Sequence, residues 1–251
     1  MYLSKKIAVV IPARLNSSRF PKKILSTIQE KTLLEWVWRA AKNIKWIDEI
    51  IFAIDHEETK KAIEQFQGKY CFTSPDCQNG TERLLELHQR KIIDADIWIS
   101  WQADEPFIKE EMIKDLLSPL ASKNPPPILT LKKRLNDEKE IDSPHIVKVV
   151  TSQSGNALYF SRSPIPFYRN TECEKVYFKH IGLYAYSKEI LGHLKSLSLS
   201  PLENAEMLEQ LRFLEAGIAI GVTPTQNETI GIDLPEHLEE ARSYAERTRF
   251  F

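Results

Sequence analysis

Short apolar runs alternate with helix-spaced apolar positions along the first half of the chain. The runs predict buried strands, which we place at Ile7–Ile11, Glu49–Ile54, Tyr70–Thr73 and Ile97–Trp101. Between and after them the spacing predicts helices near residues 33–40, 56–66, 82–91 and 110–120. Strands that alternate with helices in this way predict an α/β fold, with a mostly parallel sheet covered by helices on both faces.

The pattern changes after the proline-rich segment Ser122–Pro127. Strands with short connections are predicted at Ile128–Leu131, Ile146–Thr151, Ala157–Phe160 and His180–Tyr186. A helix at Glu203–Glu215, a strand at Ile218–Val222 and a helix at Pro235–Thr248 follow. We therefore expect a nucleotide-binding α/β domain made of residues 1–124 plus 191–251, and a smaller inserted β-rich lobe at 125–190.

The composition of the chain argues against several classes of function. The 251 residues are 42% hydrophobic and 27% charged with a net charge of −1, so no global basic field favours a nucleic-acid partner. Three cysteines without metal-site spacing fit free thiols in a reducing compartment. The chain has neither a signal-peptide apolar region nor a membrane-length apolar run, so we expect a cytoplasmic protein that has no membrane partner. No G-x-G-x-x-G follows a predicted strand, which argues against a dehydrogenase.

A basic segment directly follows the first predicted strand. It carries four cations and two hydroxyls, namely Arg14, Ser17, Ser18, Arg19, Lys22 and Lys23. Ligands of open α/β sheets bind beside the carboxyl ends of the strands, and Arg and Lys are the side chains that hold phosphate oxygens. The segment is therefore a candidate polyphosphate site; the alternative is a solvated basic loop.

Carboxylates follow the strand at Ile97–Trp101. Asp104 and Glu105 are adjacent there, and Asp104 can hold Mg²⁺, which takes one or two carboxylates and shares substrate phosphate oxygens. The alternative is an acidic turn or helix start on the surface. A further acid, Asp233, follows the late strand and reads equally as the N-cap of the last helix.

Polar residues at other element ends are weaker candidates. A turn into a helix is predicted at Asn79-Gly80-Thr81-Glu82-Arg83, and the backbone N–H groups of that helix start can meet a phosphate. The alternative is that Thr81 is an ordinary helix cap and Arg83 a surface residue. Arg162 can bind a carboxylate or pair with a local acid, and His180 at a strand start is catalytic or structural. Glu203, Glu206 and Gln210 share one face of the predicted helix, which either faces solvent or lines a pocket.

Taken in order, these segments resemble the 3-deoxy-manno-octulosonate cytidylyltransferases, the CMP-Kdo synthetase family. The resemblance runs from Val9 to about Glu240. The motifs that carry it are Pro12-Ala13-Arg14 through Lys23, Asn79-Gly80-Thr81-Glu82-Arg83, Gln102-Ala103-Asp104-Glu105-Pro106, Ala157 to Arg162, Lys179-His180-Ile181-Gly182 and Leu208-Glu209-Gln210-Leu211-Arg212.

The resemblance implies a Rossmann-like fold of the nucleotide-diphospho-sugar transferase type, with the inserted lobe serving sugar binding and dimerisation. It implies transfer of CMP from CTP to the anomeric hydroxyl of Kdo, with pyrophosphate released, in lipopolysaccharide biosynthesis, by a homodimer that uses Mg²⁺. The catalytic residues would be Arg14, Lys23 and Asp104, and the metal ligands Asp104 and Asp233. CTP would also meet Ser17, Ser18, Arg19, Thr81, Arg83 and Gln102. The sugar acid would meet Arg162, His180, Tyr184, Glu203 and Gln210.

Three positions depart from the family pattern. Ala103 and Lys22 stand where the family has glycine, and Ile24 stands where it has proline. Related enzymes act on 8-amino-Kdo or other nonulosonic acids, so those acceptors remain alternatives. A GT-A-like glycosyltransferase, which would consume a nucleotide-sugar, and a non-catalytic nucleotide-binding protein are alternatives from other classes.

Overall fold

The computed structural model describes residues 2–16 and 20–248, which fold into two compact units. The first unit comprises Met1–Ile113 and Asn227–Phe251, and the second comprises Lys114–Gln226. The second unit extends beyond the predicted lobe at 125–190, because residues 191–226 belong to it. One cause is the strand β11 (Ile220–Pro224), which pairs in parallel with β7 (Ile128–Leu135) of the same unit.

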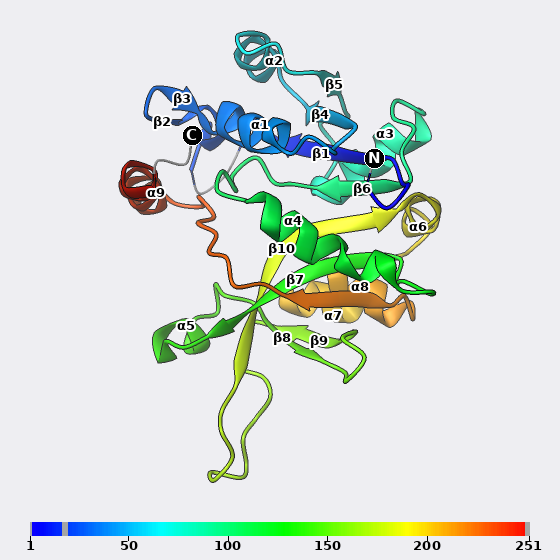
Figure 1. Ribbon diagram of the computed structural model, residues 1–251, viewed down its shortest axis with the longest axis vertical. Helices are drawn as coiled ribbons and strands as arrows, with labels where there is room; N and C mark the ends of the chain where they lie inside the picture. Colours follow the sequence, from blue (N-terminus) through cyan, green and yellow to red (C-terminus); the bar gives the residue numbers. More distant parts are fainter. Residues whose placement is uncertain (1, 17–19, 249–251) are drawn as a thin grey trace. The chain divides into compact units, whose positions relative to one another are not determined.

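The first unit is built on a parallel sheet with the strand order β6-β1-β4-β5 (Figure 1). Its strands are β1 (Ile7–Ala13), β4 (Glu49–Ile54), β5 (Tyr70–Phe72) and β6 (Ile97–Ser100). All seven residues of β1 are buried, as a continuous apolar run in the middle of a sheet requires. The predicted first-half strands and the parallel fold class are confirmed. Because the strands are parallel, their carboxyl ends lie along one edge of the sheet.

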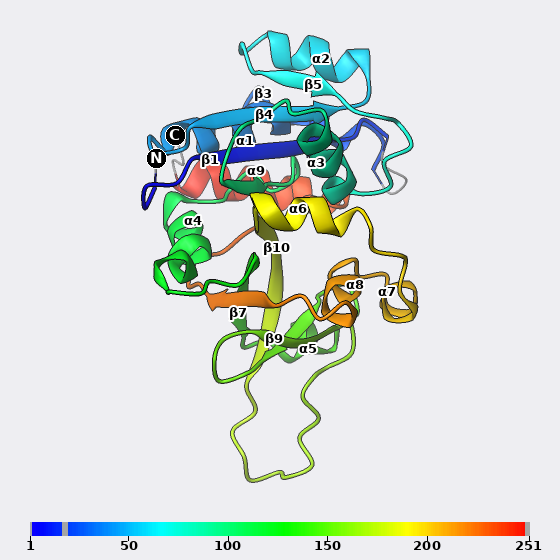
Figure 2. The ribbon, with the colours of Figure 1, turned by 90° about the vertical axis from the view of Figure 1, so that its right-hand side faces the viewer.

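Helices and a short hairpin complete the first unit. They are η1 (Lys23–Leu25), β2 (Thr27–Ile28), β3 (Lys31–Thr32), α1 (Leu33–Asn43), α2 (Glu57–Glu64), α3 (Gly80–Gln89) and α9 (Pro235–Thr248), and α4 (Glu110–Leu117) crosses from this unit into the second. Trp36 of α1 donates an indole hydrogen bond to Ile28 O at 2.8 Å. Figure 2 shows α9, in red, with the other elements of the first unit. Side chains of α9 join Trp36, Phe107 and Ile232 in one buried cluster. That cluster fixes the chain next to Asp233.

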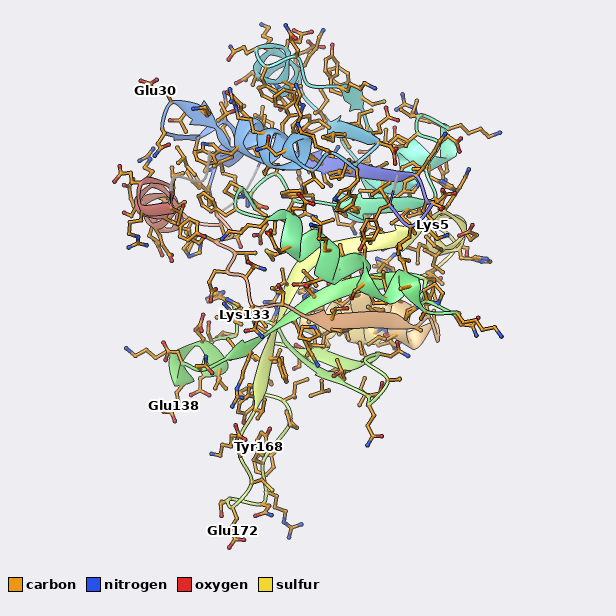
Figure 3. The ribbon with its side chains drawn as sticks, in the orientation of Figure 1. Lys5, Glu30, Lys133, Glu138, Tyr168 and Glu172 are labelled. Carbon is orange, nitrogen blue, oxygen red and sulfur yellow. The ribbon has the colours of Figure 1, made fainter. Side chains whose placement is uncertain are left out.

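The second unit is β-rich, as predicted for the lobe. Strand β7 pairs with β11 and, antiparallel, with β10 (Tyr177–Ser187), while β8 (Lys148–Thr151) pairs with β10 and β9 (Ala157–Ser161). The remaining elements are η2 (Ser118–Ala121), α5 (Glu138–Asp142), α6 (Lys188–Leu194), α7 (Pro201–Glu206) and α8 (Gln210–Glu215). The loop between β9 and β10 carries Tyr168 and Glu172 (Figure 3), and the Tyr168 hydroxyl bonds both the N–H and the carbonyl of Val176.

The single helix predicted at Glu203–Glu215 is wrong. Met207 adopts a left-handed conformation, with φ of 53°, and this ends α7 before α8 begins at Gln210. Glu203, Glu206 and Gln210 therefore do not share one helix face. In either unit, no helix within residues 2–16 and 20–248 is long and apolar enough to cross a bilayer.

Candidate active site

A cavity of about 310 Å³ opens at the carboxyl ends of β1 and β6 in the first unit. Its walls come from the end of β1, the segment after β6, the start of η1 and the turn into α3. Five predicted site residues line it together, namely Arg14, Lys23, Arg83, Gln102 and Asp104. Side chains that are far apart in the sequence thus meet at the edge of the sheet where the topology predicts a ligand.

Lys23 holds the two predicted metal ligands together. Its ammonium donates to Asp233 Oδ1 at 3.0 Å and, in a shorter contact, to Asp104 Oδ2. The side chain of Lys23 is only 13% exposed. Burial alone would lower the pKa of Lys23, but the charges and hydrogen bonds of the two carboxylates outweigh it and raise the pKa. Lys23 is therefore a fixed positive charge in this structure.

Backbone contacts explain why Asp104 and Asp233 converge. The Ile232 N–H donates to the Asp104 carbonyl oxygen at 2.9 Å, which joins the segment after β6 to the segment before α9. Ile232 is fully buried, and the Asp233 N–H donates to His237 Nδ1 at 3.2 Å. These contacts hold the two carboxylates on either side of Lys23.

Arg14 is the cation of the cavity that is open to a ligand. It is exposed, lines the cavity and has no hydrogen bond to any residue in the described part of the chain. The next residue is tied down, because the Leu15 N–H donates to Asp55 Oδ1 at 3.1 Å. Arg14 therefore projects from an anchored piece of backbone.

Arg83 lines the cavity but is almost fully buried. One guanidinium nitrogen donates to Asp55 Oδ2 at 2.9 Å and the other to Thr73 Oγ1 at 2.6 Å. The Arg83 side chain is 2% exposed and that of Asp55 is 11% exposed. Arg83 and Asp55 thus form a buried ion pair between α3 and the end of β4, and Asp55 extends it to the backbone beside Arg14.

The turn into α3 approaches Gln102 closely. The Asn79 side chain caps α3 by accepting the Glu82 N–H at 2.9 Å. A Cβ at Gly80 would lie 3.0 Å from Gln102 Nε2 and 3.1 Å from Pro12 Cγ, so only glycine fits without displacement. Thr81 is buried in the first turn of α3 and is not part of the cavity wall.

Lys22, another cation of the basic segment, does not line the cavity. Lys22 has a left-handed backbone, with φ of 55°, and its ammonium pairs on the surface with Glu58 Oε2 at 2.6 Å. Ser17, Ser18 and Arg19 lie outside the described residues. Of the two other family departures, Ala103 and Ile24 are both buried and both line the cavity.

In the second unit, Arg162 is engaged by backbone. Its guanidinium donates to the carbonyl oxygens of Glu206 at 2.8 Å and Pro144 at 2.9 Å, and its own N–H donates to the Glu206 carboxylate at 2.9 Å. Arg162 thereby fastens the end of α7 to β9. These bonds use two of the five guanidinium donors, so the predicted contact of Arg162 with a ligand carboxylate stays a prediction.

Glu203 is likewise used internally. Both of its carboxylate oxygens accept from the Arg212 guanidinium, at 2.6 and 2.5 Å, in a buried pair that joins α7 to α8. Gln210, also buried, has no described hydrogen-bond partner for its side-chain amide. Of these two predicted sugar contacts, Glu203 is thus engaged by Arg212, whereas no bond of the Gln210 amide is found among the described residues.

His180 and Tyr184 lie in an aromatic cluster on β10. His180 Nε2 is 3.0 Å from Thr130 Oγ1, and that hydroxyl is within 3.0 Å of the carbonyl oxygens of Ile181 and Leu183. The Thr130 hydroxyl has one proton for these acceptors, so the direction of its hydrogen bond with His180 Nε2 follows the tautomer of the ring. Burial lowers the pKa of His180 to about 3, so the ring is neutral. The buried Tyr184 hydroxyl has no well-formed hydrogen bond within the described residues, and burial raises its pKa.

Comparison with known proteins identifies the family. The family model described as cytidylyltransferase matches residues 8–222. The chain belongs to the cytidylyltransferases. A 3-deoxy-manno-octulosonate cytidylyltransferase from Solibacter usitatus is 41% identical over 237 residues, which cover 94% of this chain and 93% of the relative. One of the same name from Chlorobium limicola is 42% identical, with 96% and 97% covered.

A solved structure supports the same assignment. The CMP:2-keto-3-deoxy-manno-octonic acid synthetase complexed with CTP has a TM-score of 0.90 and 38% identity to this cytidylyltransferase. The match covers 96% of this chain and 99% of the synthetase. The predicted family, fold class and nucleotidyltransferase activity are therefore confirmed.

Asp55 of this cytidylyltransferase was not among the site residues predicted from the sequence. Asp55 contacts both the backbone beside Arg14 and the guanidinium of Arg83. The signal was present, because Asp55 directly follows the strand at Glu49–Ile54, at the same sheet edge as the basic segment and Asp104. Such a carboxylate belongs to no local motif. It can be recognised only from its place in the sheet, where it pairs with an internal cation.

Proposed function

We propose that this cytidylyltransferase transfers CMP from CTP to the anomeric hydroxyl of Kdo and releases pyrophosphate, as a step in lipopolysaccharide biosynthesis. The observation that carries the proposal is the cavity in which Arg14, Lys23 and Asp104 meet at the carboxyl ends of β1 and β6. Cations next to a carboxylate pair are what a metal-bound triphosphate needs. The names of the relatives that match over nearly the whole chain indicate Kdo as the acceptor of the CMP group.

The reaction forms one bond and breaks another at the α-phosphorus. The anomeric oxygen attacks, its proton passes to solvent water, and the bond from the α-phosphorus to the oxygen that bridges it to the β-phosphorus breaks. Negative charge then builds on the non-bridging oxygens and on the departing pyrophosphate. Arg14, which has no partner in the described chain, and Lys23 are the cations placed to stabilise that charge.

Asp104 and Asp233 fit a bound Mg²⁺. Oxygens of both carboxylates already converge on one cation, the Lys23 ammonium, and hard cations such as Mg²⁺ prefer carboxylate oxygens. Bound there, Mg²⁺ would neutralise triphosphate charge and orient the α-phosphate. The protein's own part is to hold the two carboxylates together and to supply the cations on the other side of the triphosphate.

For the sugar acid we propose His180, Tyr184 and Gln210 of the second unit as contacts. Their polar atoms retain hydrogen-bonding capacity, whereas Arg162 and Glu203 spend theirs on the protein. Arg162 and Glu203 are then positioning residues that fix α7 and α8. Arg83 has the same status in the first unit, where it holds Asp55.

We further propose that the enzyme is a cytoplasmic homodimer. The second unit exposes large apolar side chains, including Phe167 at 87%, Met207 at 76% and Leu158 at 62%. A second copy of the chain is the occupant that the family resemblance implies. Light scattering coupled to gel filtration should give twice the mass of 29.1 kDa.

The decisive assay measures pyrophosphate release from each of the four common nucleoside triphosphates with Kdo, 8-amino-Kdo and sialic acid. We expect CTP with Kdo to be the preferred pair. Asp104→Asn should abolish turnover without unfolding the protein, whereas Asp94→Asn, at a carboxylate that is 77% exposed, should leave it unchanged. Turnover of a nucleotide-sugar instead of CTP, or CTP binding without pyrophosphate release, would refute the proposal.

A further inference from the structure

The space between the two candidate metal ligands is held by a side chain of the protein. The Lys23 ammonium contacts Asp104 Oδ2 and lies 3.0 Å from Asp233 Oδ1. Lys23 begins η1, and Ser26 N–H bonds back to the Lys23 carbonyl oxygen at 2.9 Å, so its backbone is fixed by a short turn. The Lys23 ammonium therefore occupies the position between the two carboxylates when no ligand is bound.

A divalent ion and this ammonium cannot share the same oxygens. Mg²⁺ binds carboxylate oxygens at about 2.0–2.1 Å and needs near-octahedral space around it. A three-donor ammonium that sits between the same carboxylates fills that space, and its charge repels the ion. Either Lys23 leaves the pair or the metal stays out.

A triphosphate offers Lys23 another partner. Its oxygens are strong acceptors for an ammonium, and the Lys23 side chain lines the same cavity as Arg14, where we place the nucleotide. When Lys23 turns to a phosphate, the two carboxylates lose the ammonium that lies between them. Two like charges held close together then favour the entry of a new cation.

We propose that Lys23 and the divalent ion are alternative occupants of the Asp104–Asp233 pair, and that the nucleotide opens the pair to the metal by drawing Lys23 away. This proposal rests on the proposed function for its nucleotide and its metal, and adds a coupling between them. The protein without nucleotide keeps the metal site closed by its own lysine, and nucleotide and metal each raise the affinity for the other through Lys23.

The test measures Mn²⁺ binding to the nucleotide-free protein, with free Mn²⁺ counted by electron paramagnetic resonance. Lys23→Met should bind Mn²⁺ at least tenfold more tightly than the unmodified protein. The matched control is Lys22→Met, which removes the same charge one residue away, from the exposed pair with Glu58, and should change Mn²⁺ affinity less than twofold. Asp104→Asn combined with Lys23→Met should lose the gain.

Stability supplies a second readout in case Lys23→Met folds less well. Removal of the ammonium leaves two facing carboxylates, so Mn²⁺ should raise the Tm of Lys23→Met by more than it raises that of the unmodified protein. With α,β-methylene-CTP present, the nucleotide should increase Mn²⁺ affinity more in the unmodified protein than in Lys23→Met, because only the former has a lysine to displace.

Equal or weaker Mn²⁺ binding by nucleotide-free Lys23→Met would overturn this inference, even where the unmodified enzyme makes CMP-Kdo normally. Failure of the proposed function looks different: the unmodified enzyme would release no pyrophosphate from CTP and Kdo, while the nucleotide-free Mn²⁺ comparison would be unaffected.

Discussion

Asp55 is the residue whose loss should reveal how the nucleotide site is supported. Its carboxylate pairs with the Arg83 guanidinium at 2.9 Å, and both groups are almost fully buried. Removal of one partner of a buried ion pair leaves the other charged and unpaired, which costs about 3–5 kcal/mol. We therefore expect Asp55→Ala to lower the free energy of unfolding by about 3–5 kcal/mol. Asp55→Asn keeps an acceptor for the Leu15 N–H and loses only the charge, so its cost should be about 1.5–3 kcal/mol.

Urea unfolding followed by circular dichroism measures these costs, with the m-value required to stay constant. The control is Glu58→Gln, which breaks the exposed ion pair with Lys22 and should cost less than about 1 kcal/mol. The same variants report on function, because Asp55 anchors the backbone beside Arg14. Asp55→Asn should therefore raise KM for CTP more than KM for Kdo.

A double-mutant cycle decides whether the pair is the cause. If the cost of Asp55→Asn arises from an unpaired Arg83, then Asp55→Asn combined with Arg83→Met should destabilise less than the sum of the two single changes. Additive costs, or an Asp55→Ala variant that loses less than about 1 kcal/mol, would refute the reasoning.

Two further changes test individual residues. Lys22→Gly should be more stable than Lys22→Ala by about 1 kcal/mol. Both variants lose the ion pair with Glu58, but the left-handed φ of 55° strains alanine and not glycine. Equal urea midpoints would count against this. The pKa of His180 lies at about 3 in the folded protein, compared with an ordinary value of 6.5. Between these two pH values, His180 is protonated in the unfolded chain and neutral in the folded chain. Stability should therefore fall as pH drops from about 6.5 toward 3, by at most about 1.4 kcal/mol per pH unit, and His180→Asn should remove that part of the slope measured by urea unfolding; an unchanged slope would show that His180 titrates normally.

The parallel sheet could be predicted because its strands are continuous apolar runs. A run such as Ile7–Ile11 has no polar face to solvate, so only a central position in a covered sheet suits it. The break at Met207 could not be predicted, since methionine favours helices and nothing in the local sequence signals its left-handed backbone. The extent of the second unit was also hidden, because it depends on the pairing of β11 with β7 across about 90 residues of chain.

Candidate site residues were predictable where the topology alone collects them. Arg14, Lys23 and Asp104 stand at strand ends, and parallel strands bring their ends to one edge. Arg162 and Glu203 show what sequence cannot decide. An arginine bonds equally well to a ligand carboxylate, to a protein carboxylate or to backbone carbonyls. Only the fold shows that Arg162 meets the Glu206 and Pro144 carbonyls and that Glu203 meets Arg212.

The charges around the cavity indicate that two cations of the basic segment, Arg14 and Lys23, act at different stages of ligand binding. The sequence treats Arg14 and Lys23 as equivalent phosphate ligands, but the structure neutralises only one of them. Lys23 is balanced by two carboxylates, and Arg83 by Asp55, so neither adds attraction at long range. Arg14 has no such partner within the described chain, and it is exposed. We therefore expect the first attraction of a triphosphate to come from Arg14, and Lys23 to join when it turns from its carboxylates to the phosphates, which opens the pair to a metal ion.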